Sequence, residues 1–210
     1  MKIVIFGASG KTGILLVEHA LTKGYQVIAY IRKNKSLKYR HQNLLKVVGG
    51  LHDVDKLNEV ITGADACIST LGGGSLTQRS PHITKGIDNI VNVMEQQGVN
   101  RMIYLSSLGA GDSRQYMPII IRYFIADFIL RIPLADHNAN EKRIANSKLQ
   151  WTFVRPVELN DNLITEIVRH GTEKTKLKCS LSISRSNVAA FMLQQLTEIE
   201  YVNKSVWLHE

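Results

Sequence analysis

The feature that most constrains the fold is a glycine-rich turn between a short apolar run and an amphipathic segment. Residues 2–6 read KIVIF, residues 7–13 read GASGKTG, and an apolar face with helical spacing follows over residues 12–23. A buried strand, a turn and a helix in this order place the helix N-terminus beside the turn. Unpaired N–H groups and the helix dipole favour a phosphate there. The segment therefore fits two kinds of site, the loop of nucleoside triphosphatases and the glycine turn of dinucleotide-binding proteins.

The spacing of the glycines decides between these two sites. A triphosphate loop has four residues between its first glycine and its Gly-Lys-Ser/Thr group. Counting back from Gly10 reaches Ile5, inside the expected strand, so this loop is too short. A magnesium-binding acidic residue is also missing at the ends of the later expected strands. We interpret GASGKTG as a dinucleotide turn, in which Gly7 bends the chain, Gly10 lets the backbone approach the pyrophosphate and Gly13 permits close packing of helix on sheet.

Strand and helix patterns alternate along nearly the whole chain. Apolar runs predict strands at 2–6, 26–31, 44–48, 66–70, 102–106, 151–154 and 205–209, and helical spacing predicts helices at 12–23, 53–62 and 82–97. Alternating β and α units imply a parallel sheet covered by helices. The predicted fold class is α/β, a Rossmann-type doubly wound parallel sheet with helices on both faces. Since no repeat or linker is visible, we expect residues 1–210 to form a single domain.

The end of the second strand predicts which dinucleotide is bound. An acidic residue there binds the ribose hydroxyl of NAD, whereas a basic residue accepts the 2′-phosphate of NADP. The chain has Arg32 at this place, followed by Lys33. The planar guanidinium of arginine can bind a phosphate through two parallel hydrogen bonds. The predicted cofactor is therefore NADP(H).

The net charge of +8 is uneven, because no acidic residue lies between Glu18 and Asp53. Such a basic stretch can serve nucleic acid, an acidic membrane surface or an anionic ligand. Neither a helix-turn-helix nor a pair of RNA-binding aromatic residues is present, so we expect no nucleic-acid partner. Most of these basic residues are interpreted as solvated surface.

Compartment and metal content are predicted from the few cysteines and from the apolar runs. Cys67 and Cys179 lack the close spacing of a zinc site, so no metal is expected, and two isolated cysteines fit a reducing compartment. The first residues do not have a signal-peptide pattern, and no apolar run is long enough to span a membrane. We therefore expect a cytoplasmic protein, with its oligomeric state left open.

Taken with these motifs, the sequence resembles the atypical short-chain dehydrogenase/reductase family, the NmrA-like NAD(P)-binding proteins, and most closely their flavin reductase/biliverdin reductase B type. The resemblance covers nearly the whole chain, through GASGKTG (7–13), YIRK (30–33), ITGADAC (61–67), LGGG (71–74), GIDNIVNVMEQQGVNRMIYLSS (86–107) and LQWTFVRP (149–156). By matching position, the resemblance implies that the cofactor is bound by Gly7, Ser9, Gly10, Lys11, Thr12, Gly13, Arg32, Lys33, Leu51, Leu71, Gly72, Gly73, Ser106, Ser107, Pro156 and Val157. The two serines and the last two residues are the ones implied to lie near the nicotinamide.

The chain departs from the family pattern at two places. Relatives often have a Gly-Asp pair after the third strand, whose carboxylate can bind the adenine amine, but this chain has Gly49 and Gly50. Many relatives also carry a lysine shortly before a glutamate in the helix that precedes the sixth strand. Here the stretch reads DHNANEKR (136–143), with His137 and Asn138 near that position.

The catalytic machinery of ordinary short-chain dehydrogenases is missing, because no tyrosine is followed by a lysine four residues later. Hydride transfer to a flat, electron-poor acceptor needs little more than positioning, and water can supply the proton. We therefore predict an NADPH-dependent reductase of a small aromatic or conjugated acceptor, such as a flavin, quinone or tetrapyrrole. Ser107 is the catalytic candidate, since it can donate a hydrogen bond to acceptor or cofactor, or else cap the turn after its strand. The alternative function is a catalytically silent NADP(H) sensor that acts through a protein partner.

Three further features leave more than one interpretation open. His137 and Glu141 are spaced to share a helix face and are best interpreted as a solvated pair. Glu158 follows the sixth strand and is a candidate for the pocket. The apolar segment 117–134 fits a helix that starts near Pro118 and ends near Pro133, as a packed helix, a pocket wall or a contact surface.

Overall fold

The structure is a computed structural model that describes residues 1–33, 37–72, 75–117, 129–162, 168–172 and 182–210. Its centre is an eight-stranded sheet whose strands, in spatial order, are β3 (Leu44–Val48), β2 (Gln26–Ile31), β1 (Lys2–Phe6), β4 (Ala66–Ser69), β5 (Arg101–Leu105), β6 (Gln150–Pro156), β10 (Lys204–His209) and β8 (Arg169–Gly171). Neighbours are parallel except for β10 and β8. Strands β7 (Glu158–Asn160) and β9 (Ser182–Ser184) form a separate parallel pair.

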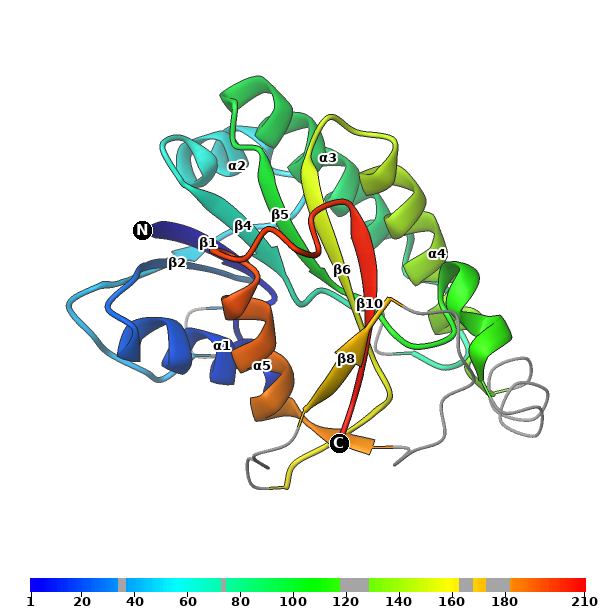
Figure 1. The fold of residues 1–210 in the computed structure, drawn as a ribbon. Helices are drawn as coiled ribbons and strands as arrows, with labels where there is room; N and C mark the ends of the chain where they lie inside the picture. Colours follow the sequence, from blue (N-terminus) through cyan, green and yellow to red (C-terminus); the bar gives the residue numbers. More distant parts are fainter. Residues whose placement is uncertain (34–36, 73–74, 118–128, 163–167, 173–181) are drawn as a thin grey trace.

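Helices cover both faces of the sheet, as Figure 1 shows. α1 (Lys11–Thr22) and α5 (Arg185–Gln194) pack together on one face. α2 (Val54–Ile61), α3 (Pro81–Gln97) and α4 (Arg131–Ala145) form a row on the other face. The strand order reverses beside β1, which is the position where open α/β sheets bind ligands. The predicted α/β fold with a doubly wound sheet is confirmed.

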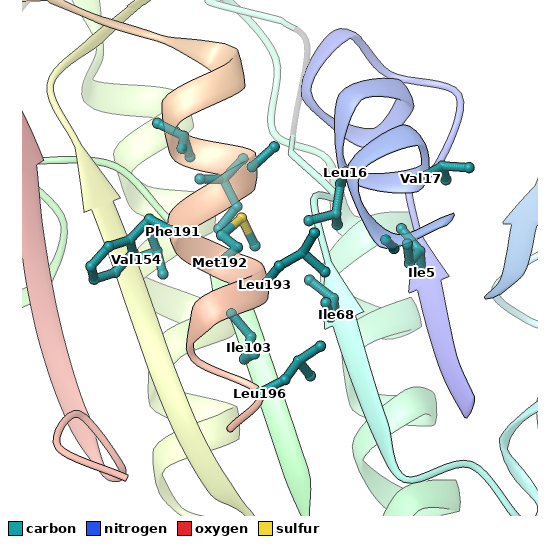
Figure 2. Close-up of a cluster of buried hydrophobic side chains, with 14 of the residues drawn as sticks. Ile5, Leu16, Val17, Ile68, Ile103, Val154, Phe191, Met192, Leu193 and Leu196 are labelled. Carbon is teal, nitrogen blue, oxygen red and sulfur yellow. The ribbon is translucent and has the colours of Figure 1, made fainter. Parts of the chain in front are cut away.

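Alternation along the strands divides the core into two layers. Ile3 and Ile5 of β1 face α1 and α5, whereas Val4 and Phe6 face the other helices. Figure 2 shows the first layer, where Met192 and Leu193 of α5 lie against side chains of the strands and of α1. The central strands β1, β2, β4 and β5 bury both faces, and their sequences are almost continuously apolar, as is typical of parallel strands.

Several helices begin or end near the residues that the sequence predicted, because capping residues are present there. The Asp53 side chain accepts a hydrogen bond of 3.1 Å from the backbone N–H of Lys56 and caps α2. Pro81 occupies the first turn of α3, and Gly98, with φ of 69°, ends that helix in the left-handed conformation.

Two helices that complete the fold were not fully predicted. α5 gave no helical signal because it is buried on most sides and lacks a polar face. α4 begins at Arg131, so Pro133 lies in a first helical turn rather than at the end of a helix. Residues 118–128 lie outside the described part of the chain, and the interpretations of segment 117–134 stay open. A separate finding is that none of the helices described is both long and apolar enough to cross a bilayer.

Candidate functional site

The turn between β1 and α1 is built so that only small residues fit. Gly7 has φ of 79°, and a Cβ atom there would lie 2.7 Å from the Thr70 hydroxyl of the neighbouring strand end. A Cβ atom on Gly13 would collide with the carbonyl oxygen of Gly7. The N–H of Gly10 donates to that same oxygen over 2.9 Å, which closes the turn. The contacts of Gly7 and Gly13 agree with the tight turn and the close packing predicted for them, and the approach of Gly10 to a pyrophosphate stays a prediction.

The turn leaves the start of α1 open to an anion. Gly10 is the N-cap residue and supplies no side-chain oxygen to the first N–H groups of the helix. Those N–H groups have no intrahelical acceptor, and the helix dipole adds partial positive charge at the same end. A pyrophosphate can therefore accept hydrogen bonds here without displacing a protein group.

A cavity of about 870 Å³ extends from this turn along the carboxyl ends of β1, β2 and β4 to the start of α3. Seven of the predicted cofactor residues line it: Gly7, Ser9, Gly10, Arg32, Leu51, Leu71 and Gly72. The sequence prediction missed the lining residues Tyr30, Ile31, Gly49, Gly50, His52, Thr70, Ser75, Gln78, Arg79, Ser80, His82, Ile83, Lys85 and Gly86. Many of the missed residues belong to the loop before α3 and to its first turns, which sequence spacing alone cannot assign to a site.

The charged residues that line the described part of the cavity are all cationic. Its cationic side chains are Arg32, Arg79 and Lys85, and none of the described residues that line it is acidic. Arg79 is paired with Asp136 of α4, which neutralises it. Within the described ranges Arg32 and Lys85 form no ion pair, so the lining has a net positive charge that favours phosphate groups.

The missing carboxylate after β3 has a packing explanation. The imidazole of His52 lies so close to Gly50 that a Cβ atom on Gly50 would meet its Nδ1 at 2.7 Å. The Tyr30 hydroxyl donates to the Gly50 carbonyl over 2.9 Å and fixes the same loop. An aspartate at position 50 would force His52 to move. The imidazole of His52 therefore lines the cavity beside Gly50.

Leu51 is held at the cavity wall by α3. The Asn89 side-chain amide donates to the Leu51 carbonyl over 2.8 Å. Gly86 faces the Leu51 side chain, and a Cβ atom on that glycine would come within 2.5 Å of it. Leu51 is thus positioned by two residues of α3 that sequence reasoning did not connect with it.

A buried hydrogen-bond chain lies beside the cavity, at the end of β5. The Tyr104 hydroxyl is 3.0 Å from Nδ1 of His137, and the Asn140 side-chain amide donates to that hydroxyl over 2.9 Å. Burial raises the pKa of Tyr104 well above its usual value and lowers the pKa of His137. Near neutral pH both side chains are therefore uncharged. The i, i+3 spacing of His137 and Asn140 was the available sequence signal, but Tyr104 lies too far away in sequence to be paired with them.

A sequence profile of the family described as NAD(P)H-binding matches residues 7–199. The chain belongs to this NAD(P)H-binding family. Over 209 residues it is 27% identical to UPF0659 protein YMR090W of Saccharomyces cerevisiae, a match that covers 93% of this chain and 87% of that protein. The predicted membership of an NAD(P)-binding family with a Rossmann fold is confirmed.

Solved structures show the same fold. A wide-type short-chain dehydrogenase/reductase from Veillonella parvula, in complex with NADP, has a TM-score of 0.83 and 18% identity, with 100% of this chain and 94% of that chain covered. ChuY, an anaerobillin reductase from Escherichia coli O157:H7, has a TM-score of 0.81 and 22% identity, with 100% and 97% covered. At such low identity the likeness concerns the fold alone.

The remaining described residues that were predicted to bind the cofactor are not among those that line the cavity. Thr12, Gly13, Lys33, Ser106, Ser107, Pro156 and Val157 do not line it, and Gly73 lies outside the described residues. The Lys11 ammonium forms an exposed ion pair of 2.7 Å with Asp161, which also binds Arg185 at the start of α5. The Lys11 side chain thus contacts the loop after β7, and its contact with phosphate stays a prediction.

The two serines after β5 differ in their surroundings. The Ser107 hydroxyl donates to the Leu108 carbonyl over 3.2 Å, which agrees with a turn-capping role. The Ser106 hydroxyl is buried and has no hydrogen-bond partner in the part of the chain that the structure describes. A catalytic role for Ser107 stays a prediction, and Ser106 has the freer hydroxyl.

The interpretation of His137 and Glu141 as a solvated pair was wrong. Glu141 is only 4% exposed and binds Arg155 of β6, which is 5% exposed. His137 faces Tyr104 instead of Glu141. The helix buries this face because α4 packs against β6, which spacing along one helix does not reveal.

Proposed function

We propose that this protein is an NADPH-dependent reductase that transfers hydride to a small aromatic or conjugated acceptor. The observation that carries the proposal is the cavity, which joins the glycine turn to a wall whose described charged residues are all cationic. Membership of the NAD(P)H-binding family supports the dinucleotide. The bound NADP of the Veillonella parvula structure and the reductase activity of ChuY are consistent with the same chemistry on this fold.

The residues divide the task of binding between them. The turn at 7–13 and the first N–H groups of α1 would hold the pyrophosphate, and Arg32 would bind the 2′-phosphate. Leu51 and His52 would contact the adenine, while Leu71 and Gly72 would pass along the middle of the cofactor. When bound, the reduced nicotinamide supplies the hydride. The chain itself supplies orientation and a dry environment for the acceptor.

Other parts of the proposal concern the chain as a whole. The first and last strands, β1 and β10, belong to one sheet, which supports a single NAD(P)-binding domain over residues 1–210. Cys67 is a buried free thiol, which fits the reducing interior of a cell and hence a cytoplasmic protein. The flavin reductase/biliverdin reductase B type stays our choice of subtype, because the acceptor side offers no tyrosine–lysine pair.

Binding and turnover test this function separately. Titration calorimetry with NADPH and NADH should show tighter binding of NADPH. The absorbance of the reduced nicotinamide should then fall when flavin mononucleotide, menadione or biliverdin is added as acceptor. NADPH binding without turnover of any acceptor would favour the silent sensor, and a failure to bind either dinucleotide would refute both functions.

A further inference from the structure

The buried chain of Asn140, Tyr104 and His137 has a direction. The Asn140 amide N–H donates to the Tyr104 hydroxyl oxygen, so the tyrosine proton must point elsewhere. The Nδ1 atom of His137, at 3.0 Å, is the acceptor available to that proton in the described residues. With Nδ1 accepting, a neutral imidazole carries its own proton on Nε2. The tautomer of His137 thus follows from the orientation of the Asn140 amide, which leaves Asn140 Oδ1 buried without a hydrogen-bond partner in the described residues.

His137 does not line the cofactor cavity itself but lies next to a residue that does. Gly72 lines the cavity, and a Cβ atom added to it would lie 4.0 Å from Cε1 of His137, the ring carbon between Nδ1 and Nε2. No hydrogen-bond partner of Nε2 is found in the described ranges. The hydrogen-bonded Nδ1 atom of the imidazole thus lies towards Tyr104, and the Cε1 atom lies towards the loop after β4.

The backbone around His137 is fixed on both sides. The preceding residue, Asp136, accepts a hydrogen bond of 2.9 Å from the N–H of Ser80, where α3 begins. The following residue, Asn138, accepts one of 2.6 Å from the N–H of Gly111 in the loop after β5. Both loops border the end of the sheet at which the acceptor must approach. Such anchoring is what a preorganised polar group requires.

Ser106 provides a second observation at the same place. Its N–H bonds to the Val154 carbonyl over 2.8 Å, which continues the ladder of β5 by one residue. Alternation then directs its side chain to the same face as Tyr104, two residues earlier. Its buried hydroxyl lacks a partner within the described residues. A buried hydroxyl without a partner suits a ligand atom that would complete it.

We propose that His137 presents a neutral Nε2–H group as a hydrogen-bond donor to the carbonyl oxygen of a conjugated acceptor, with Tyr104 and Asn140 as its positioning residues. This inference rests on the proposed reductase function and narrows its substrate to acceptors that carry such an oxygen. The acceptor carbon gains the hydride from the reduced nicotinamide, which is oxidised, and the displaced electron pair moves to the conjugated oxygen. The donor stabilises that oxygen, and water then supplies the proton.

The tautomer can be measured without any turnover. Nitrogen-15 spectra of histidine-labelled protein bound to NADP⁺ should show His137 with its proton on Nε2, and Tyr104→Phe should shift the ring towards a mixture of tautomers. Tyr104→Phe keeps the aromatic ring and removes only the hydroxyl. A wild-type ring protonated on Nδ1 would overturn the inference.

Two variants of His137 test its contact with the acceptor. His137→Gln retains an N–H group near the place of Nε2, whereas His137→Leu fills similar space without a donor. We expect His137→Leu to lower kcat with menadione about 100- to 1000-fold, as for loss of one oxyanion donor, and His137→Gln to lower it less. The affinity for NADPH should stay within about twofold in both, because the donor serves the acceptor. Equal losses in the two variants would overturn the inference.

A binding experiment tests the donor role even if the wild-type protein reduces none of the acceptors. Menadione added to the NADP⁺ complex should still shift the Nε2 resonance of His137. If it does, the donor role stands although the reductase function has failed. If the resonance does not move at saturating menadione, the donor role is refuted on its own.

Discussion

Glu141 of α4 and Arg155 of β6 form a bidentate ion pair in the interior, with N–O distances of 2.9 and 2.8 Å. The third partner is Asp112, which lies in the short 3-10 helix Gly111–Tyr116 after β5 and binds the remaining guanidinium nitrogen over 2.6 Å. The group thus ties α4, and with it His137, to the carboxyl end of the sheet. A Cβ atom on Gly111 would collide with the same guanidinium, so the loop closes directly over the pair.

Removing one member of this pair should destabilise the fold strongly. We expect Glu141→Leu to lower the free energy of unfolding by about 3 kcal/mol, because Arg155 would keep a buried charge with only Asp112 as partner. The double variant Glu141→Leu/Arg155→Met should recover most of the loss, since no buried charge remains. Urea denaturation measures both changes. A double variant as unstable as the single one would contradict this account.

Arg32 should discriminate between the two dinucleotides. Arg32→Asp removes a cation from the cavity wall and places a negative charge where the 2′-phosphate is expected. Loss of a charge-assisted hydrogen bond corresponds to about a 10- to 100-fold weaker affinity for NADPH. Binding of NADH should change little or improve, because it lacks that phosphate. Titration calorimetry with each dinucleotide measures the difference.

A charge-matched control separates a local contact from general electrostatics. Arg40 is exposed and does not line the cavity, so Arg40→Asp changes the net charge equally. It should weaken NADPH binding far less than Arg32→Asp does. Equal losses for NADPH and NADH in Arg32→Asp would refute the role assigned to this arginine.

Two glycines of the turn should respond differently to the same substitution. A Cβ atom on Gly13 would meet backbone atoms of Gly7 and Ala8, so Gly13→Ala should lower the free energy of unfolding by about 1–3 kcal/mol. Gly10 has φ of −75°, and its nearest atom to an added Cβ is 3.3 Å away. Gly10→Ala should change stability little but weaken NADPH binding, because its methyl group would face the pyrophosphate. Thermal unfolding and calorimetry would test this, and identical profiles would count against it.

Stability should fall on mild acidification. Burial lowers the pKa of His137 and of His19, so below about pH 6.5, the ordinary histidine pKa, the unfolded chain binds protons that the native state does not. The free energy of unfolding should therefore decrease as the pH falls from 6.5 towards 5.5, by at most about 1.4 kcal/mol per pH unit for His137 and by less for the half-exposed His19. His137→Gln and His19→Gln should each flatten this slope. An unchanged slope in both variants would show that other groups control it.

The short-range features of this protein follow from its sequence. The apolar run, the glycine spacing and Arg32 lie within the first 32 residues, and the backbone geometry of one strand, turn and helix places them together. Residues of the predicted turn and the predicted arginine line the cavity. The periodic patterns also predicted the strands of the parallel sheet, because burial on both faces leaves a continuous apolar run.

The polar contacts on the proposed acceptor side could not be predicted from the sequence, because tertiary packing creates them. His137 meets Tyr104 across 33 residues, Asp136 meets Ser80 across 56, and Glu141 meets Arg155 although spacing suggested a solvated helix face. These contacts depend on how α4 lies against α3 and β6, which involves long-range packing and not local propensity. The sequence alone determined the dinucleotide turn, because its residues are neighbours along the chain. Only the folded structure decided which polar groups lie together at the proposed acceptor side, because separate elements bring them together.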